Sequence, residues 1–469
     1  LDLNAVFVLS VVICGAIGVW GVLAPDAMTG AAAALTGFAL TTLDWFFLTL
    51  TTSFVVLAAV LALGPYGSIK LGHDDDEPEF STASWIAMLF AGGMGAGLLF
   101  WGPAEPMYHF TAPPGLEGGT PEAARLAMVI TNLHWGLHAW SIYAVCALVI
   151  AYFIFRRDRP GMISTPIRYA FRGRLIGPLA TAADVLGVVA VILGLAGSLA
   201  LGTLQVRAGL GEVFGVPATT TASIAIVCVL AVCFFTSAST GLGQGIKILS
   251  NINMVIAILV MLFILFFGPT QFVLQPFTTT LGDYLNNLFT ISFRLYPYEG
   301  LTEWTAGWTL TYLIWWLAWG PFVGVFIARI SRGRTIREFM LGVVLIPSLF
   351  SMFWFATFGG AGFYVELFGP GGLADMVFDD VAKALFALFD YFPLTEVVST
   401  AALLLIFIFL VTSADSGTFV VSMMTSHGDL NPATAQKLAW ALVILAITIG
   451  TLFTGSVDVA KTLAVTGAI

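Results

Sequence analysis

Long apolar runs separated by short polar segments repeat along most of the chain. Each run has about 20 residues or more, which is enough for a helix to cross the hydrocarbon core of a bilayer. In lipid, backbone groups must pair within their own segment, so these runs are expected to be helices. A twelfth run begins near Val457 and is cut off at Ile469. The first eleven are 4–24, 43–63, 83–101, 125–155, 178–204, 219–238, 246–268, 308–329, 339–362, 396–424 and 432–453.

The composition supports an all-α polytopic membrane protein. Of 469 residues, 59% are hydrophobic and only 10% are charged, whereas soluble domains carry roughly 25% charged residues. The net charge of −9 indicates no nucleic-acid partner. The first run lacks a basic leading segment, so it is interpreted as a span and not as a signal peptide. All four cysteines fall within apolar runs, which favours core packing over disulfides: Cys14, Cys146, Cys228 and Cys233.

Arginines mark one side of the membrane. Four follow the eighth run and six follow the fourth, whereas segments 102–122, 269–300 and 363–395 together hold only Arg294 and Lys383. Because basic residues concentrate in cytoplasmic loops, we expect the N-terminus in the cytoplasm and the protein in the plasma membrane. The ten arginines are Arg156, Arg157, Arg159, Arg168, Arg172, Arg174, Arg329, Arg332, Arg334 and Arg337.

An aromatic stripe occupies the middle of the eighth run. Tyr312, Trp315, Trp316 and Trp319 follow the i, i+3, i+4, i+7 spacing that places side chains on one face of a helix. Gly320-Pro321 comes next and predicts a loosened helix, because proline removes a backbone donor. Interfacial aromatic belts lie at the ends of spans. We therefore interpret this mid-span stripe as the wall of a binding site.

The third run is also interrupted, by the glycine-rich stretch 91–97. It lies five spans before the eighth run. Broken spans in corresponding halves point to a transporter built from inverted repeats, with its site near the midplane. Close helix packing is the alternative explanation for the glycines. A dinucleotide loop is rejected, because the stretch does not follow a strand.

Between runs seven and eight, the pattern around 281–289 predicts an amphipathic helix on the membrane surface.

Four segments resemble the betaine/choline/carnitine transporter family. They are AGGMGAGLLFWGPAEP at 91–106, HWGLHAWSIY at 134–143, WWLAWGPFVGVFIARISRGRTIREF at 315–339 and TSADS at 412–416. The resemblance covers nearly the whole chain and implies a LeuT-type fold, with two inverted five-helix repeats after two peripheral helices, in a homotrimer. It divides the chain into two peripheral helices with an acidic cytoplasmic loop (1–82), a first repeat (83–268), a surface helix and loop (269–306), and a second repeat whose last helix is truncated (307–469).

The resemblance also implies an onium-binding site. A methylated onium group has no proton to donate, so aromatic faces bind it by cation–π attraction of roughly 0.5–2 kcal/mol each. Trp316 matches the principal ring, and the substrate carboxylate would meet backbone amides in the loosened third span. Gly97 stands where choline carriers tend to have an acidic residue, which favours a zwitterion. The implied binding residues are Gly93, Met94, Gly95, Gly97, Trp135, Trp140, Tyr143, Trp315, Trp316 and Trp319.

A sodium site is implied as well. Thr412 and Ser413 would supply hydroxyls, and Ala91, Met94 and Phe409 would supply carbonyls. The alternative is that the two hydroxyls only bond back to their own helix. Sodium-independent relatives place an arginine at Asn253, which here is neutral.

A second ion site of sodium-coupled betaine carriers needs two hydroxyls on the fifth span. Val191 and Leu195 stand at those positions and offer no oxygen. Phe322 remains on the eighth span, and Ser198, one turn from Leu195, could partly compensate. We therefore expect one sodium ion per substrate.

Other polar residues in the runs are given structural roles. His134 and His138 have a spacing that can bind zinc, but no third ligand is evident, so hydrogen bonds between helices are favoured. Asp415 is interpreted as structural, and Asp184 is ionisable and lies near or within a span. Arg207 is expected to follow the fifth span at the interface.

The resulting hypothesis is a sodium-coupled secondary transporter that imports a zwitterionic methylated onium compound by alternating access. Glycine betaine and dimethylsulfoniopropionate are the substrates considered, and sodium is the coupling ion, with no other cofactor. A sodium-independent carnitine or choline exchanger or uniporter of the same family is the alternative. A channel and an intramembrane enzyme using His134 and His138 remain competing classes. The enzyme is disfavoured because the sequence shows no nucleophile or third metal ligand.

Overall fold

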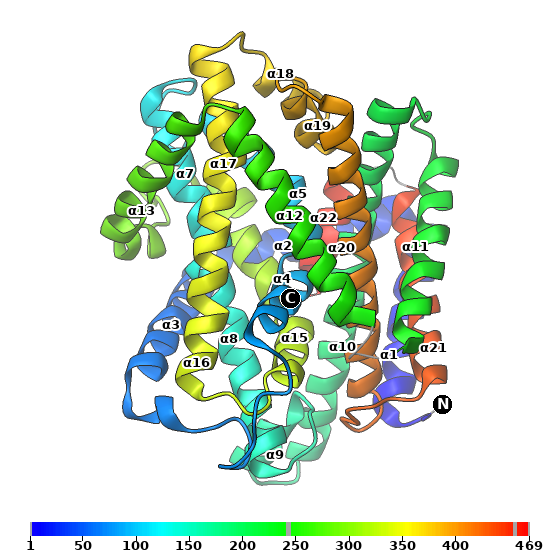
Figure 1. The fold of residues 1–469 in the computed structure, drawn as a ribbon. Helices are drawn as coiled ribbons and strands as arrows, with labels where there is room; N and C mark the ends of the chain where they lie inside the picture. The colour runs from blue at the N-terminus through cyan, green and yellow to red at the C-terminus, as the bar shows by residue number, and fades with distance from the viewer. Residues whose placement is uncertain (1, 241–244, 454–456, 468–469) are drawn as a thin grey trace.

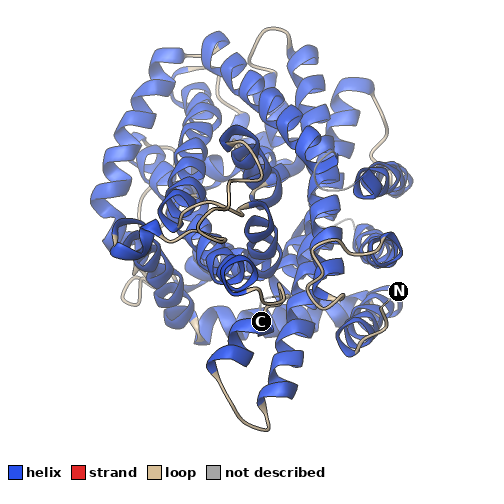
Figure 2. Ribbon diagram, turned by 60° about the horizontal axis from the view of Figure 1, so that its bottom comes forward, coloured by secondary structure: helices blue, strands red, loops and turns tan. Residues whose placement is uncertain are grey.

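The computed structural model describes residues 2–240, 245–453 and 457–467, and the regular elements in these ranges are helices joined by loops (Figures 1 and 2). Nine described helices are long and apolar enough to cross a membrane, or up to eleven if each bent pair is one span. The prediction of an all-α polytopic membrane protein is therefore confirmed. The α-helices are α1 Ala5–Leu23, α2 Pro25–Thr42, α3 Asp44–Leu63, α4 Thr82–Gly93, α5 Gly95–Trp101, α6 Ala104–Thr111, α7 Pro121–Trp135, α8 Leu137–Ala151, α9 Ser164–Ala170, α10 Ile176–Phe214, α11 Thr220–Thr240, α12 Lys247–Phe267, α13 Thr270–Ser292, α14 Thr302–Thr305, α15 Thr311–Ile330, α16 Ile336–Met340, α17 Ile346–Phe368, α18 Leu373–Asp379, α19 Ala384–Phe389, α20 Thr395–Met424, α21 Thr434–Leu452 and α22 Val457–Thr466.

The centre of the bundle is formed by α10 and α15. In each, 89% of the most apolar window is buried, compared with 33% in α3 and α11. α15 packs on α8 and α10, and α10 also contacts α20, α21 and α22. Figure 1 shows α3 and α11 on opposite flanks of the bundle. A helix that is apolar all round but fully buried is a core helix, whereas α3 and α11 present much of their apolar surface outward, as expected toward lipid.

The third run breaks where its glycines predict. α4 and α5 meet at a bend of 65°. Met94 caps α4, and Gly95 follows with a φ of +43°. That left-handed conformation favours glycine because it carries no Cβ. A Cβ on Gly95 would also lie 3.1 Å from the hydroxyl of Ser413 on α20.

The eighth run does not break, and this corrects the prediction for Gly320-Pro321. α15 runs from Thr311 to Ile330 as one α-helix with Pro321 inside it. Gly320 leaves room beside the proline, because a Cβ there would have its nearest neighbour at 3.9 Å, on Ile142. The irregular turn comes earlier, as a π-helical segment at Ala306–Leu310. The proline is accommodated within the helix rather than ending it.

Three further boundaries differ from the sequence expectation. The fourth run splits at Gly136 into α7 and α8. The backbone at this split favours glycine, because a Cβ on Gly136 would lie 2.5 Å from the carbonyl of Asn132. α2 occupies 25–42, a stretch rich in alanine, glycine and threonine whose hydropathy is too low to predict a span. α10 continues to Phe214, so Arg207 lies inside it, partly buried, and donates to Ser223 Oγ at 3.2 Å.

The acidic loop after α3 pairs with arginines that are distant in sequence. Arg329 donates to Glu79 at 2.7 Å, Arg332 to Asp76 at 3.2 Å, and Arg156 to Asp74 at 2.6 Å. The Arg332 guanidinium lowers the pKa of Asp76. These contacts place the loops after α3, α8 and α15 on one face of the bundle. The predicted surface helix is present as α13, which extends over 23 residues and packs on α7 and α17.

Candidate functional site

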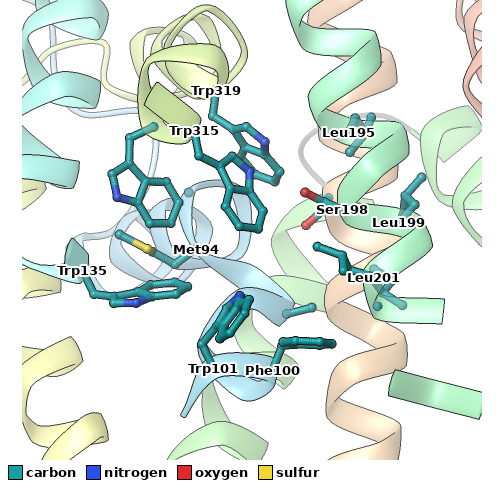
Figure 3. Close-up of a pocket in the computed structure, with 17 residues that line it drawn as sticks. Met94, Phe100, Trp101, Trp135, Leu195, Ser198, Leu199, Leu201, Trp315 and Trp319 are labelled. Atoms are coloured by element: carbon teal, nitrogen blue, oxygen red, sulfur yellow. The ribbon is translucent and has the colours of Figure 1, made fainter. Parts of the chain in front are cut away.

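A cavity lies between the broken helix pair α4–α5, the aromatic face of α15 and the middle of α10 (Figure 3). The cavity is small, with a volume of ≈ 50 Å³ open to water-sized molecules. Its wall is almost wholly apolar and aromatic, with a few polar groups, as is usual for small-molecule sites. The lining residues are Gly93, Met94, Ala96, Gly97, Phe100, Trp101, Trp135, Leu195, Ser198, Leu199, Leu201, Gly202, Trp315, Trp316, Trp319, Leu410 and Ser413.

Seven of the ten residues that the sequence proposes for onium binding line this cavity: Gly93, Met94, Gly97, Trp135, Trp315, Trp316 and Trp319. The other three lie directly behind it. Trp140 supports Gly93, where a Cβ would be 2.8 Å from its ring. Tyr143 packs edge-on against Trp140 and Trp316. Gly95 faces Ser413. The structure therefore divides the proposed set into a lining layer and a supporting layer.

The tryptophans meet at a corner of the cavity. The rings of Trp315 and Trp316 are nearly parallel, with centroids 5.9 Å apart at 17°. Trp135 stands edge-on to Trp316, with centroids 5.0 Å apart at 68°. Trp316 therefore contributes to both walls of the corner. Its indole N–H is already used, because it donates to the carbonyl of His134 at 2.7 Å.

Three other polar groups at the cavity have no hydrogen-bond partner among the described residues. They are the hydroxyl of Ser198 and the indole N–H groups of Trp315 and Trp319, all buried. Ser198 belongs to α10 and lies across the cavity from Trp135 (Figure 3). Buried donors are rarely left unpaired without a reason. Trp319 Nε1 lies beside Gly194 of α10, where a Cβ would be 3.0 Å away, so Ser198 and Trp315 are the two donors of this set left for an anionic group in the cavity.

Part of the lining has only a weak signal in the sequence. Trp101 and Phe100 were not singled out, although Trp101 is one helical turn after Gly97 on α5. That spacing was the available signal. Ser198 was considered only as an ion ligand, and Leu195 only as a position that lacks oxygen. Both line the cavity, because α10 presents this face to α15 and α5.

Oxygen atoms gather where α4 breaks beside α20. The main chain bridges the break with bonds from Met94 N–H to Phe90 O and from Gly97 N–H to Met94 O. The carbonyl of Ala91 accepts the Ser413 hydroxyl at 3.4 Å. Thr412 donates to its own helix, at 3.0 Å to Phe409 O and 3.1 Å to Ile408 O. Ala91 and Ser413 thus connect α4 to α20, while Thr412, Phe409 O and Met94 O make local bonds next to this contact.

The positions of a second ion site are apolar. Val191 and Leu195 are buried, as is the ring of Phe322. Leu195 lies against Gly417 of α20, where a Cβ would be 2.4 Å from Leu195 Cδ2. Because the packing here is this tight, a methyl group of Leu195 occupies this position of the second ion site.

A buried polar cluster lies behind the aromatic corner. Glu105 and His109 of α6 meet His134 of α7, and one ligand atom of each lies within 4.8 Å of the others, so the three could hold a metal ion. The sequence paired His134 with His138 instead. His138 faces Thr52 at 3.4 Å, whereas His134 contacts Glu105 at 2.6 Å and Thr309 at 2.9 Å. The i, i+4 spacing of Glu105 and His109 was the missed signal.

Asp184 and Asp415 lie away from the cavity lining. Asp184 accepts from the Ser164 N–H at 2.9 Å, and Asp415 accepts from Ser237 at 2.5 Å. Asn253 donates to Thr412 at 3.5 Å, which places the neutral amide beside the oxygen junction.

An apolar helical bundle around an aromatic cavity, with one core helix broken at that cavity, defines a membrane transporter for a small molecule. The chain belongs to the betaine/carnitine/choline family of transporters, whose family model matches residues 5–469. It is accordingly a transporter and not an enzyme.

The chain is 42% identical over 469 residues to the glycine betaine transporter OpuD of Bacillus subtilis, covering 100% of this chain and 91% of the relative. It is 42% identical over 464 residues to an ectoine/hydroxyectoine transporter of Virgibacillus pantothenticus, covering 98% and 91%. Among solved structures, MhsT in complex with L-phenylalanine is similar at 15% identity with a TM-score of 0.46, covering 84% of this chain and 87% of that one. The last likeness is too weak to support an argument.

Proposed function

We propose that this protein is a sodium-coupled secondary transporter that imports a zwitterionic methylated onium compound of the glycine betaine type by alternating access. The observation that carries the proposal is the aromatic corner of Trp135, Trp315 and Trp316 beside unpaired donors. Ring faces attract an onium group that cannot donate hydrogen bonds, and the enclosed wall excludes competing water. A ligand with a cation at one end and an anion at the other matches both features.

The carboxylate end has two candidate partners. The Ser198 hydroxyl and the indole N–H group of Trp315 are unpaired donors at the cavity. The backbone amides at the start of α5, after the break, are the second set, as the sequence implies. A buried donor that gains an acceptor no longer bears an unpaired desolvation penalty of about 1–3 kcal/mol. We therefore expect both sets to favour a zwitterion over a simple cation.

Sodium would couple transport through the α4–α20 junction. The hydroxyls of Thr412 and Ser413 with the carbonyls of Ala91, Met94 and Phe409 form the proposed ligand set. An ion there would connect α20 to the half-helix α4, whose Gly93 and Met94 line the cavity. Ordering this junction would favour the arrangement that binds substrate, and substrate would favour ion binding in return.

The apolar side chains of Val191 and Leu195 support one sodium ion per substrate. One ion still supplies about 2.3 kcal/mol per 100 mV of membrane potential, in addition to its own gradient. Reversal-potential measurements in proteoliposomes test this ratio directly. A ratio of two sodium ions per zwitterion would contradict it and would point to further oxygen ligands, with Ser198 the first to examine.

The substrate can be identified by a binding screen on the purified protein. Glycine betaine, dimethylsulfoniopropionate, ectoine, choline and carnitine are titrated with and without sodium, following intrinsic tryptophan fluorescence. We expect sodium-dependent binding of glycine betaine. Ectoine is included because one relative of equal identity bears that name. Sodium-independent exchange of carnitine or choline would favour the alternative transporter, and uptake without saturation or counterflow would indicate a channel.

The proposed orientation places the N-terminus and the arginine-rich loops in the cytoplasm of the cell, in the plasma membrane. The ion pairs between the loops after α3, α8 and α15 support a shared side. Cysteine labelling from either side of the membrane at loop positions tests it. The proposed homotrimer is tested by mass measurement in detergent.

A further inference from the structure

The aromatic corner is attached to a buried carboxylate that does not line the cavity. Glu105 on α6 has 0% exposure. Its Oε2 accepts the indole N–H of Trp135 at 2.6 Å. Its Oε1 accepts from His134 Nδ1 at 2.6 Å and faces His109 Nε2 at 3.4 Å. A buried carboxylate needs several donors to replace lost water, and it has three.

The protonation of this cluster follows from its donors and acceptors. An ionised carboxylate only accepts hydrogen bonds, so the two histidine nitrogens that face it carry protons. His134 Nε2 is then free to accept the hydroxyl of Thr309 at 2.9 Å. The Lys461 ammonium interacts electrostatically with Glu105 and lies over the rings of Trp308, Trp101 and Tyr312, at 5.0, 5.4 and 6.0 Å.

The geometry of Trp135 shows what this attachment does. Its five-membered ring is held by Glu105 through Nε1. The opposite edge lies over Gly97, where a Cβ would be 3.1 Å from Cη2 and 3.4 Å from Cζ3. One end of the indole is therefore fixed outside the cavity, and the other end forms part of the wall. Trp316 is fixed in the same way, by its 2.7 Å bond to the carbonyl of His134.

We propose that Glu105 is a positioning residue for the aromatic corner, holding the Trp135 ring in the orientation that receives the onium group. This inference rests on the proposed function, because it concerns the same cavity. Without the carboxylate, Trp135 Nε1 and His134 Nδ1 would be buried donors without an acceptor, and other ring orientations would become competitive. Binding then includes the cost of reordering the ring.

A glutamine substitution separates this role from the alternatives. Glu105→Gln keeps an oxygen that can accept the indole N–H, but it removes the charge. Glu105→Ala removes both. A metal site or a proton carrier at Glu105, His109 and His134 would be lost in both variants. A positioning role through the hydrogen bond predicts that glutamine rescues much of what alanine loses.

The experiment measures substrate affinity in the purified full chain with glycine betaine as the probe. We expect Glu105→Ala to weaken binding about tenfold or more, and Glu105→Gln about threefold or less, since unpaired buried donors are costly. The matched control is Ser331→Ala, which removes the acceptor of another buried tryptophan, Trp85, bonded at 2.9 Å. This control should keep the affinity of the wild type. Equal losses in the glutamine and alanine variants would overturn the positioning role.

A double-mutant cycle keeps the test valid if the alanine variant does not fold. Trp135→Phe removes the indole N–H, so adding Glu105→Gln to it should weaken binding by no more than a further twofold or so. Full additivity of the two losses would contradict the proposal. The ultraviolet resonance Raman band that reports indole hydrogen bonding, assigned by difference with Trp135→Phe, should shift in Glu105→Ala without any ligand present. An unshifted band would likewise contradict it.

The failure of this inference and the failure of the proposed function give different results. If the wild type binds no zwitterionic onium compound, the proposed function is wrong, whereas the Raman shift still reports the attachment of Trp135. If the wild type binds glycine betaine and Glu105→Ala binds it equally well, only the positioning role is wrong.

Discussion

Two apolar spans beside the cavity, the third and the eighth, contain residues that disfavour a helix. Only the third span is interrupted. The third span bends by 65° at Met94–Gly95, whereas α15 continues through Gly320-Pro321. At the bend, Gly95 has a positive φ, and the carbonyl of Ala91 accepts the Ser413 hydroxyl of α20. Along α15, the intact helix keeps three tryptophans on one face. The break supplies polar main-chain atoms and the continuous helix supplies a surface of aromatic rings, so a ligand with both polar and aromatic requirements suits the pair.

The largest effect is expected on the unbroken helix. Trp316→Leu should weaken glycine betaine binding by about 100-fold or more, because it removes the ring shared by both walls and a buried aromatic anchor. Titration calorimetry on folded, monodisperse protein measures the loss. Trp20→Leu, at an exposed position of α1, is the control. Affinity near that of the wild type would place the onium site elsewhere.

Next is the junction beside the broken helix. Thr412→Ala should reduce the sodium stimulation of uptake about thirtyfold, since one hydroxyl ligand to a charged group contributes about 1.5–3 kcal/mol. Uptake into proteoliposomes across a sodium range provides the measurement. Ser422→Ala is the matched control, because this buried hydroxyl of the same helix bonds back to Thr418 O. Uptake at the rate of the wild type without sodium in Thr412→Ala would overturn the coupling itself.

The bend can be tested at the residue that makes it. Gly95→Ala places a Cβ in a left-handed conformation that costs about 1–2 kcal/mol, and 3.1 Å from the Ser413 hydroxyl. We expect apparent sodium affinity to fall about tenfold. Gly177→Ala, where a Cβ meets open space, is the control. Unchanged sodium affinity would show that the bend is not needed for the ion junction.

The half-helix after the bend should control selectivity. Gly97→Asp is expected to shift the ratio of choline to betaine affinity about fivefold toward choline, because a carboxylate in a low-dielectric site pairs with a lone cation and repels a substrate carboxylate. Competition binding measures the ratio. Gly97→Ala separates charge from size, since any Cβ lies 3.1 Å from Trp135 Cη2. An identical ratio in both variants would exclude the charge effect.

The smallest effect should come from Pro321, which does not interrupt its helix. Pro321→Ala restores a backbone donor within a helix that is already continuous, so substrate and sodium affinities should stay within about twofold of the wild type. The same titrations apply, with Gly95→Ala as the contrasting variant. A tenfold change would mean that α15 bends at Pro321 during transport.

Much of the fold could be predicted from the sequence, because the bilayer imposes a simple rule on it. Apolar runs of span length identified every helix from α3 onward that crosses the core, although boundaries such as Phe214 in α10 were not predicted. α2 was missed because its alanine, glycine and threonine residues are helical without being strongly hydrophobic. Gly136 was missed because a single glycine in an apolar run gives no sign that the chain must avoid the carbonyl of Asn132.

The candidate site was predicted in parts. The i, i+3, i+4, i+7 spacing placed Trp315, Trp316 and Trp319 on one face, and the glycine run located the broken helix. Neither pattern could show that Trp140 and Tyr143 lie one layer behind the wall. That depends on how α8 rotates against α15, which is a matter of packing between helices distant in sequence.

The sequence by itself determined the membrane-spanning class, the aromatic composition of the binding face and the glycine-rich break, because these follow from local hydropathy and backbone chemistry. Only the tertiary structure decided that the chain bends at Gly95 and not at Pro321, since the free-energy cost of a kink depends on the space and the hydrogen-bond partners around it. It also brought Glu105, His134 and Trp135 together across two helices and an intervening loop. A hydrogen bond between distant residues leaves no periodic trace in a sequence, because it depends on the position of atoms and not on their order in the chain.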